Sequence, residues 1–176
     1  MKRLFVTLGM VLVLSMSAAP GCLAAEQVGS DTLADWDIKV PNYANTMSVL
    51  DGEDGNYYVY TEGERGIPYV KLHAYRGFES EAAFFDEETE YLQETYPDLQ
   101  VISDMELVTI NGDAYYEVDY IYSVSGYTCV DRRIARTIGE MTYMFASKEV
   151  PELDLTVGTL LEDMIADCVF LGAEAA

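Results

Sequence analysis

Hydrophobic and polar side chains alternate with a period of two over several stretches of the chain, which predicts β-strands. In the first half, the alternation marks residues 35–40, which end at Pro41, and then residues 56–62 and 68–75. Residues 42–50 fit neither a strand nor a helix clearly. The third strand carries Val70, Leu72 and Ala74 on one face and Tyr69, Lys71, His73 and Tyr75 on the other. The predicted strand therefore has one apolar face and one polar, aromatic face.

Two segments change to the 3.6-residue period of an amphipathic helix. Over residues 80–96 the apolar face runs through Phe85, Leu92 and Tyr96, with Ser80 as N-cap and a stop at residue 97. Over residues 154–168 the stripe consists of Val157, Leu161, Met164 and Cys168. Such a stripe needs a partner surface, so we expect the last helix to pack on a sheet.

The second half predicts an antiparallel meander. Residues 99–110 form one or two strand segments, and a tight Asn111-Gly112 turn follows them. Strands are then predicted over 114–123, 127–138 and 141–147, each joined to the next by a short turn. The whole pattern predicts one α+β domain over residues 35–171, an antiparallel sheet flanked by helices in an α/β/α sandwich, with a tail at 172–176.

This order of elements resembles the PsbP-like and DcrB-like fold. The likeness rests on the early strand before Pro41, the Tyr/Val-rich hairpin, the helix opening near 78–80, the segments 96–103 and 110–116, and the closing helix before 168–170. It covers residues 35–171 and includes no catalytic signature. Members of this fold are accessory and binding proteins: a subunit that steadies the photosynthetic water-oxidising complex, bacterial envelope lipoproteins and a nuclear Ran-binding factor. The resemblance therefore implies an accessory role and no particular site residue.

Residues 1–25 read as an export signal, with Lys2 and Arg3 before an apolar run and small residues after it. The apolar run is about 13 residues long, short of the roughly 20 that span a bilayer. Cys22 follows a lipobox-like triplet, so we expect it to be lipidated and to anchor the protein to the membrane. Cleavage after Ala24 or Ala25, which gives a secreted protein, is the alternative. Residues 26–34 are small and polar and are expected to form a tether.

Charge excludes some classes of partner. Removing the first 21 residues takes away two cations and no carboxylates, which changes the net charge from −21 to −23. Such an acidic chain is unsuited to nucleic acid and to anionic lipid headgroups, both of which need Lys and Arg. The expected partners are a protein or small ligand of the cell envelope, and the membrane itself if Cys22 is modified.

The two remaining cysteines are not expected to form a bridge. The meander places Cys129 at the end where the last helix starts, and Cys168 lies about 14 residues beyond that start, roughly 20 Å along a helix. A disulfide needs Cα atoms within about 7 Å. We therefore expect two free thiols that behave as small hydrophobic groups.

Catalytic, cofactor and metal sites are not indicated. His73 is the only histidine, and no nucleophile elbow accompanies it. The loop at 51–56 has oxygen ligands but fails the EF-hand pattern, so a solvated turn is expected, with a loose cation site as the alternative. The cluster Arg132, Arg133 and Arg136 is expected to pair with Glu117 and Asp119 on the neighbouring strand, with an anionic ligand or partner as the alternative.

These observations favour a non-catalytic exported accessory or binding protein, extracytoplasmic and tethered to the envelope or secreted. A secreted hydrolase that works through carboxylates is the alternative, because the chain has 31 acidic residues. A pocket with two facing carboxylates, or with His73 beside an acid, would favour the hydrolase. A continuous exposed aromatic patch without buried charges would favour binding.

Overall fold

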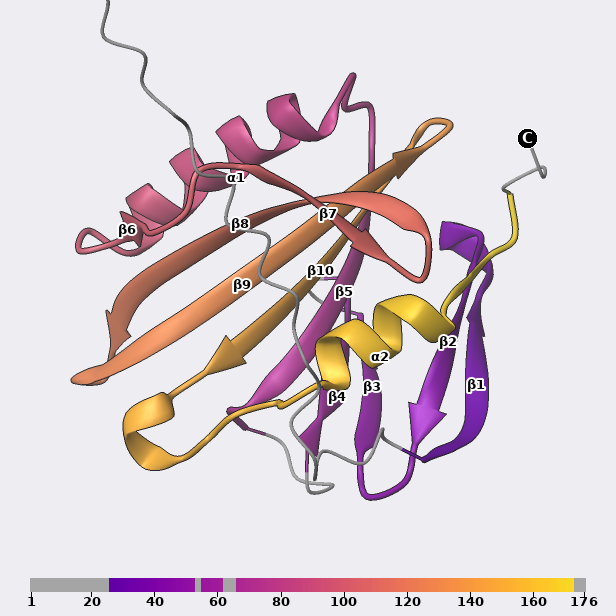
Figure 1. Ribbon diagram of the computed structural model, residues 1–176, viewed down its shortest axis with the longest axis horizontal. Coiled ribbons are helices and arrows are strands. Elements are labelled where there is room, and N and C mark those ends of the chain that lie inside the picture. Colours follow the sequence, from indigo (N-terminus) through magenta and orange to yellow (C-terminus); the bar gives the residue numbers. More distant parts are fainter. Residues whose placement is uncertain (1–25, 53–54, 62–65, 173–176) are drawn as a thin grey trace, which may run out of the picture.

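The fold is built on an eight-stranded antiparallel sheet, seen in a computed structural model that describes residues 26–52, 55–61 and 66–172. The strand order is β3-β4-β5-β10-β9-β8-β6, and β7 also pairs with β8 (Figure 1). The strands are β3 (Met47–Asp51), β4 (Asn56–Tyr60), β5 (Tyr69–Arg76), β6 (Gln100–Val101), β7 (Glu106–Ile110), β8 (Asp113–Val124), β9 (Tyr127–Ile138) and β10 (Met141–Glu149). The consecutive strands β8, β9 and β10 form the predicted meander.

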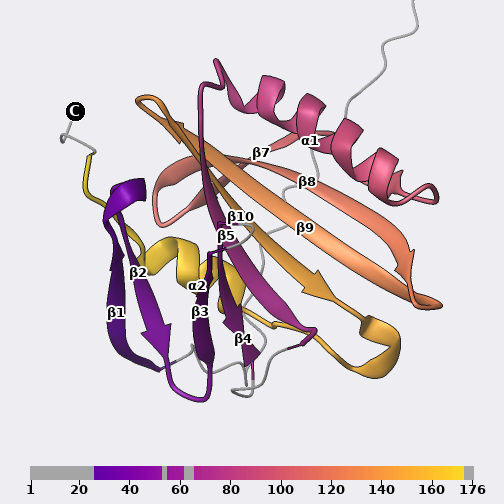
Figure 2. The same cartoon turned by 180° about the vertical axis from the view of Figure 1, so that it is seen from behind.

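A second, three-stranded sheet lies beside the first and has the order β1-β2-β11. It contains β1 (Gln27–Leu33), β2 (Ile38–Tyr43) and β11 (Val169–Phe170). The two ends of the described chain meet here, since β11 pairs with β2 at Lys39 and Ile38. This pairing closes the fold around the last helix (Figure 2).

The large sheet buries a hydrophobic core on each face. On one face, the helix α2 (Leu160–Asp167) packs with the small sheet against residues such as Tyr143 and Phe145. On the other face, α1 (Glu81–Thr95) buries Phe84, Phe85 and Leu92 against β8, β9 and β10. The α+β fold with a sheet between helices is therefore confirmed.

The predicted stripe on the last helix is buried, as expected. Met164 and Leu161 are 0% and 1% exposed, and both belong to the core under α2. Cys168 packs against the same core from its edge. Both Cys129 and Cys168 are free thiols, as the sequence predicted.

Local sequence signals set several boundaries correctly. The Ser80 side chain accepts a hydrogen bond from the Ala83 backbone N–H at 3.2 Å, which caps the start of α1. Asn111 and Gly112 both have positive φ angles, +51° and +88°, as a tight hairpin turn between β7 and β8 requires.

The predicted tether at 26–34 is wrong. Residues 27–33 form β1, which pairs with β2 from Leu33↔Ile38 to Gln27↔Tyr43. Most of its side chains are exposed. The strand is held by backbone hydrogen bonds rather than by an apolar face, so its sequence carries no strand-like alternation.

Three element boundaries also differ from the prediction. Residues 34–36 form a short 3₁₀ helix, η1 (Ala34–Trp36), and β2 continues through Pro41. At Pro41 the strand has no β11 partner, and an edge position tolerates the missing N–H. The ambiguous segment 42–50 contains most of β3.

The closing helix is shorter than the predicted 154–168. A 3₁₀ helix, η3 (Pro151–Leu153), comes first, and Asp154 and Gly158 then adopt left-handed conformations with φ of +58° and +59°. An α-helix cannot pass through these conformations, so α2 starts only at Leu160. Over the described residues no helix has the length and apolar character needed to cross a bilayer.

Residues 1–25 lie outside the described part of the chain, and with them the export signal and Cys22. The same holds for residues 53–54 of the candidate cation loop and for 173–176 of the tail.

Candidate functional site

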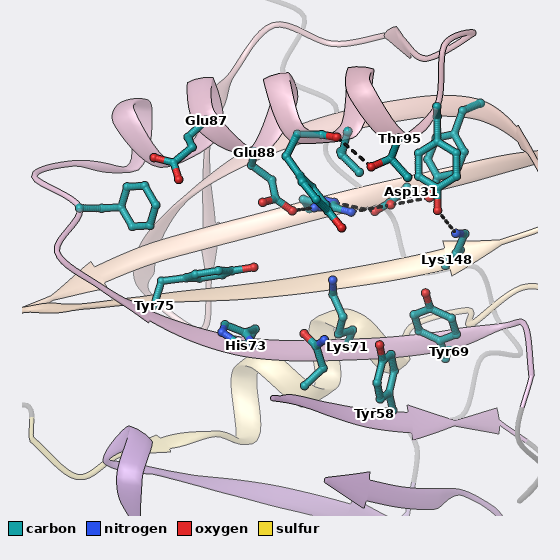
Figure 3. A pocket seen from close by; sticks show the side chains of 17 residues that line it. Tyr58, Tyr69, Lys71, His73, Tyr75, Glu87, Glu88, Thr95, Asp131 and Lys148 are labelled. Carbon is teal, nitrogen blue, oxygen red and sulfur yellow. Dashed lines mark hydrogen bonds and ion pairs between the residues drawn. The ribbon is translucent and has the colours of Figure 1, made fainter. Parts of the chain in front are cut away.

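A cavity of about 540 Å³ lies between α1 and the part of the sheet that α1 leaves uncovered. Because α1 packs mainly on β8, β9 and β10, and reaches β5 at Tyr75, β4 and most of β5 lie beyond the helix on this face of the described sheet. The gap becomes a pocket with α1 as one wall and β5 as the other (Figure 3). We call it the tyrosine pocket; it is lined by Asn56, Tyr58, Tyr69, Lys71, His73, Tyr75, Phe78, Glu87, Glu88, Tyr91, Leu92, Thr95, Tyr96, Tyr122, Asp131, Arg133 and Lys148.

Strand alternation along β5 supplies the lower wall. Tyr69, Lys71, His73 and Tyr75 point to the pocket side, while Val70, Leu72 and Ala74 are buried on the α2 side. Both faces are therefore as the sequence predicted. What the sequence did not indicate is that the polar face lines a cavity instead of facing open solvent.

Aromatic contacts lie at both ends of the pocket. At one end Tyr75 packs on Phe84 of α1 and on His73, with ring centroids 5.2 and 4.2 Å apart. At the other end Tyr96 stacks on Tyr122 with centroids 4.0 Å apart. These rings offer flat apolar surfaces with polar edges, which suit a small ring-containing or polar ligand.

The floor of the pocket is a buried ionic cluster centred on Arg133. Its guanidinium donates from Nε and Nη2 to the two oxygens of Asp131 at 3.0 and 2.9 Å, and Nη1 pairs with Glu88 of α1. The side chains of Arg133, Asp131 and Glu88 are only 5%, 4% and 11% exposed. The Tyr122 hydroxyl also donates to Asp131, at 2.8 Å. The cluster joins α1 to β9 through charge-assisted hydrogen bonds.

Burial dominates the electrostatics of this cluster. Loss of solvent raises the pKa of Asp131 to about 6, while the Tyr122 hydroxyl and the nearby Lys71 and Lys148 act in the opposite direction. Loss of solvent likewise lowers the pKa of Arg133 to about 10. At neutral pH the arginine therefore stays charged, and Asp131 is predominantly ionised.

Two lysines complete the polar lining. Lys148 of β10 donates to the Tyr96 hydroxyl at 3.4 Å and lies 4.9 Å from the centre of the Tyr122 ring. Lys71 projects from β5 toward α1 (Figure 3). Both lysines line the same cavity as Asp131, and their positive charges oppose the rise in the pKa of its carboxyl.

His73 lies in the pocket wall, between two aromatic neighbours. Its ring centroid is 4.2 Å from that of Tyr75 and 5.5 Å from that of Trp36. Trp36 comes from η1, outside the large sheet, and is the only tryptophan of the chain. His73 lies on the predicted strand, and its burial is intermediate.

The pocket has part of the pattern expected of a hydrolase and fails the pattern expected of a binding surface, because its aromatic lining lies beside buried charges. It is concave and holds Glu88, Asp131 and His73, yet it is also lined with aromatic rings. The two buried carboxylates share one guanidinium. A general acid and a nucleophile need different environments, because their pKa values must differ. Here both carboxylates are instead partners of the same guanidinium, that of Arg133.

The other two arginines of the predicted cluster lie on the opposite face of the sheet, toward α2. Arg132 donates to the two carboxylate oxygens of Glu117 at 2.8 and 2.7 Å, as predicted, and also pairs with Glu162 of α2. Arg136 pairs with Asp113 at 2.9 Å. Because alternation along β9 sends Arg133 to the other face, the three side chains do not form one cationic cluster.

The predicted role of Asp119 is wrong. Among the described residues it forms no ion pair with an arginine, although it lies opposite Arg132 in the β8–β9 register. Arg132 reaches past it to Glu117. Burial, together with the neighbouring Glu117, raises the pKa of Asp119, and one of its oxygens is buried without a hydrogen-bond partner among the described residues.

Within the described ranges, no group of three or more His, Cys, Asp or Glu side chains is arranged to hold a metal ion. The loop at 51–56 lies partly outside these ranges, so its proposed cation site stays a prediction.

No protein-family model and no curated protein sequence matches this chain. Similar folds occur among solved structures. Cyanobacterial PsbP (CyanoP) from Synechocystis sp. PCC 6803 has a TM-score of 0.59 at 13% identity, over 88% of this chain and 97% of that one. LpqN, described as involved in cell envelope biogenesis of Mycobacterium tuberculosis, has a TM-score of 0.52 at 11% identity, over 75% and 82%.

A protein of Bacteroides thetaiotaomicron VPI-5482 has a TM-score of 0.54 at 13% identity, and the match covers 84% of this chain. It covers 49% of the Bacteroides chain, so this chain matches about half of that protein's length. Together these likenesses show a PsbP-like fold, as the order of elements predicted.

Proposed function

We propose that this protein is a non-catalytic, extracytoplasmic binding protein that holds a small polar ligand in the tyrosine pocket. The observation that carries the proposal is the cavity itself, which has aromatic walls and a floor whose carboxylates both contact Arg133. A volume of about 540 Å³ lies within the range of small-molecule sites. The likeness to LpqN, an envelope-biogenesis protein, supports a role in the cell envelope.

The proposal includes an anchor at Cys22. The basic, apolar and small-residue order of residues 1–25 supports export, and the position of Cys22 supports lipidation. The mass of the mature N-terminal peptide tests this directly. A diacylglyceryl-modified Cys22 is expected, whereas a peptide starting at Ala25 or Glu26 would show ordinary secretion.

Ligand capture tests the binding role. The purified protein is incubated with an envelope extract, washed and unfolded, and the small molecules released are identified by mass spectrometry. The informative variant is Tyr91→Ala, because Tyr91 lines the pocket from α1 and is 60% exposed, so its loss costs little stability. Tyr127→Ala is the matched control, since Tyr127 is 45% exposed in the β8–β9 hairpin, away from the pocket.

We expect one compound or compound class to be enriched on the wild-type protein and on Tyr127→Ala, and depleted on Tyr91→Ala. A second variant, Thr95→Trp, places a large side chain at the pocket wall and should also exclude the compound. Equal capture by all four proteins, or no enrichment at all, would contradict the proposal.

The alternative function is a secreted carboxylate-dependent hydrolase. It is favoured by the presence of Glu88, Asp131 and His73 in one cavity. The shared contact with Arg133 argues against it, because a carboxylate held in this way is a poor base. Time-dependent cleavage of the captured compound by the wild-type protein, lost in Glu88→Gln, would replace the binding role with this one.

A further inference from the structure

The helix α1 has a hollow on each of its two flanks. The tyrosine pocket lies on the β5 side, and a smaller cavity of about 190 Å³ lies on the other side, beside the segment that connects β6 to β7. We call the smaller cavity the edge groove; it is lined by Ala82, Phe85, Asp86, Thr89, Val101, Ser103, Asp104, Met105 and Val118. Small-molecule sites begin at roughly 300 Å³, so this cavity suits one side chain better than a whole ligand.

Hydrogen bonds hold both walls of the edge groove. The Ile102 backbone N–H donates to the carbonyl oxygen of Asp119 on β8 at 2.9 Å, and the Asp119 backbone N–H donates to the Ser103 hydroxyl, also at 2.9 Å. On the helix side, the hydroxyls of Thr89 and Tyr120 form a hydrogen bond of 2.8 Å. The groove is therefore a fixed part of the domain.

Apolar side chains beside the groove are exposed because the sheet ends there. Within the described residues no strand lies beyond β6 and β7. Val101 of β6 lies opposite Tyr120 of β8. Leu107 of β7 lies opposite Tyr116, and both tyrosines pack in the core under α1. Since cross-strand partners share a face, Val101 and Leu107 face the α1 side, where they are 45% and 63% exposed. With Met105, which is 41% exposed, they form what we call the apolar strip.

The charges around the groove are negative. Asp86 of α1 and Asp104 of the β6–β7 connection both line it and are exposed. Residues 77–131, which include α1, β6, β7 and β8, contain 14 Asp and Glu and no Lys, Arg or His. Arg133 lies opposite Val118 in the β8–β9 register, but its guanidinium lines the tyrosine pocket and is held there by two carboxylates. A cation in the groove would therefore meet carboxylates without a competing positive charge from the described lining.

These two properties select one kind of occupant. The groove floor is apolar, since Phe85 and Val118 are each 4% exposed, while its rim carries carboxylates. A lysine or arginine side chain matches both, because its alkyl stem packs on apolar surface and its charged end pairs with carboxylates. Anionic lipid headgroups would be repelled. A second copy of this chain would also bring a net charge of −21 against the acidic surface.

We propose that the edge groove and the apolar strip bind a basic, amphipathic segment of a partner protein. A lysine or arginine of that segment enters the groove and pairs with Asp86 and Asp104, and its apolar neighbours cover Val101, Met105 and Leu107. Exposed apolar surface rimmed by polar side chains is typical of a protein-interaction site. This surface does not overlap the tyrosine pocket, so the proposal does not depend on the ligand-binding function.

Peptide selection tests the chemistry of the partner. The purified full chain is used to select peptides from a displayed library of random sequences, and the enriched peptide is then synthesised. It should contain Lys or Arg beside apolar residues, and its binding should weaken as salt is raised. The double variant Asp86→Asn/Asp104→Asn should bind it at least tenfold more weakly. The matched control, Glu140→Gln/Asp154→Asn, removes two exposed negative charges elsewhere and should bind as the wild-type protein does.

Met105 locates the bound peptide. In protein labelled at the methionine methyl groups, the Met105 signal, assigned with Met105→Leu, should shift when the peptide is added. The signal of Met144, which is 0% exposed in the core, should stay in place. Met105→Gln should weaken binding, whereas Leu153→Gln, which changes a 47% exposed side chain on η3, should not.

Three results would overturn the proposal: selection enriches no basic peptide, the groove variants bind as tightly as their controls, or the Met105 signal does not shift. Binding of phosphatidylglycerol vesicles that is lost in Met105→Gln would assign the strip to the membrane, and dimerisation lost in Met105→Gln would assign it to a second copy. Either result would also contradict a basic partner. Ligand capture by the tyrosine pocket is measured on a different surface, so each function can fail without the other.

Discussion

Arg133 binds Asp131 through two hydrogen bonds, although the two residues are separated by only one position on the same strand. The Nε–Oδ1 and Nη2–Oδ2 distances are 3.0 and 2.9 Å, and both side chains lie on the pocket face of β9. A bidentate pair within one strand leaves Nη1 free to reach Glu88 on the helix above. The strand thus presents a preassembled ionic group on which α1 packs.

Removing the guanidinium should destabilise the protein strongly. Arg133→Met leaves Asp131 and Glu88 buried without their counter-charge, which we expect to cost about 3–5 kcal/mol of unfolding free energy. Chemical denaturation measures this loss, which should shrink at acid pH as the carboxylates become protonated. The control is Asp113→Asn, which breaks the pair with Arg136 at a half-exposed position and should cost less than about 1 kcal/mol. Equal losses in the two variants would contradict the buried cluster.

Docking of α2 on the sheet should depend on Met164. Its side chain is 0% exposed in the core under α2, so Met164→Ala leaves a cavity and should cost about 2–5 kcal/mol. Met105 is 41% exposed, and Met105→Ala should change stability by less than about 0.5 kcal/mol. Thermal unfolding of both variants checks the difference, and a small loss for Met164→Ala would mean that α2 does not bury its apolar stripe.

Buried tyrosines should make the protein sensitive to alkaline pH. Burial raises the pKa of Tyr120 to about 12 from an ordinary value of 10, and the pKa values of Tyr43, Tyr57, Tyr69, Tyr75, Tyr115, Tyr122 and Tyr143 are also raised, with burial as the largest cause. The folded state then holds protons that the unfolded chain releases. The stability that these bound protons contribute is fully present below pH 10 and is lost as the pH rises through the folded pKa values. Each tyrosine accounts for about 1.4 kcal/mol per unit by which its folded pKa exceeds its unfolded pKa.

We therefore expect unfolding to begin above pH 10, with tyrosinate absorbance and loss of circular dichroism rising together. In Tyr120→Phe the decline in stability with pH should be less steep, because there is one proton fewer that the folded state holds and the unfolded chain releases. Tyrosinate formation in a protein that stays folded would count against the burial of these side chains.

Asp119 should be replaceable with a gain in stability. Burial and the neighbouring Glu117 raise its pKa, so its charge opposes folding at neutral pH. Asp119→Asn should therefore stabilise the protein at pH 7 by up to about 1 kcal/mol, the upper size of one side-chain pair on a sheet face. Because the pKa of Asp119 is raised in the folded state, this residue favours folding most below its unfolded pKa of about 3.8, and less as the pH rises. The gain in stability of Asp119→Asn should therefore vanish in acid.

Melting temperatures at neutral and acid pH measure this difference. Glu90→Gln on the exposed side of α1 is the control for loss of a negative charge. If both variants gain equally, the effect comes from the net charge of the chain and not from the site of Asp119.

The sequence predicted the elements better than their arrangement. Alternation along 68–75 identified both faces of β5, because side-chain direction in a strand depends only on position. It could not indicate that α1 covers mainly β8, β9 and β10 and leaves most of β5 open, since that depends on which strands neighbour the helix in space. The tyrosine pocket was missed for this reason, although Lys71 and His73 were assigned to the correct face.

The arginines show the same limit on a smaller scale. The pairing of Arg132 with Glu117 followed from neighbouring strands, and the structure confirms it. The partners Glu88 and Glu162 come from helices whose positions over the sheet no local pattern specifies. A closer use of alternation on β9 would have separated Arg133 from Arg132 and Arg136.

The strand β1 sets how far the domain can lie from a lipid on Cys22. The Glu26 carbonyl already accepts the Ala44 backbone N–H, at 2.8 Å, so only residues 23–25 separate the folded sheet from the proposed anchor. Four fully extended steps of backbone span at most about 14 Å. A lipidated protein would therefore lie directly against the headgroups instead of moving through a wide volume above them.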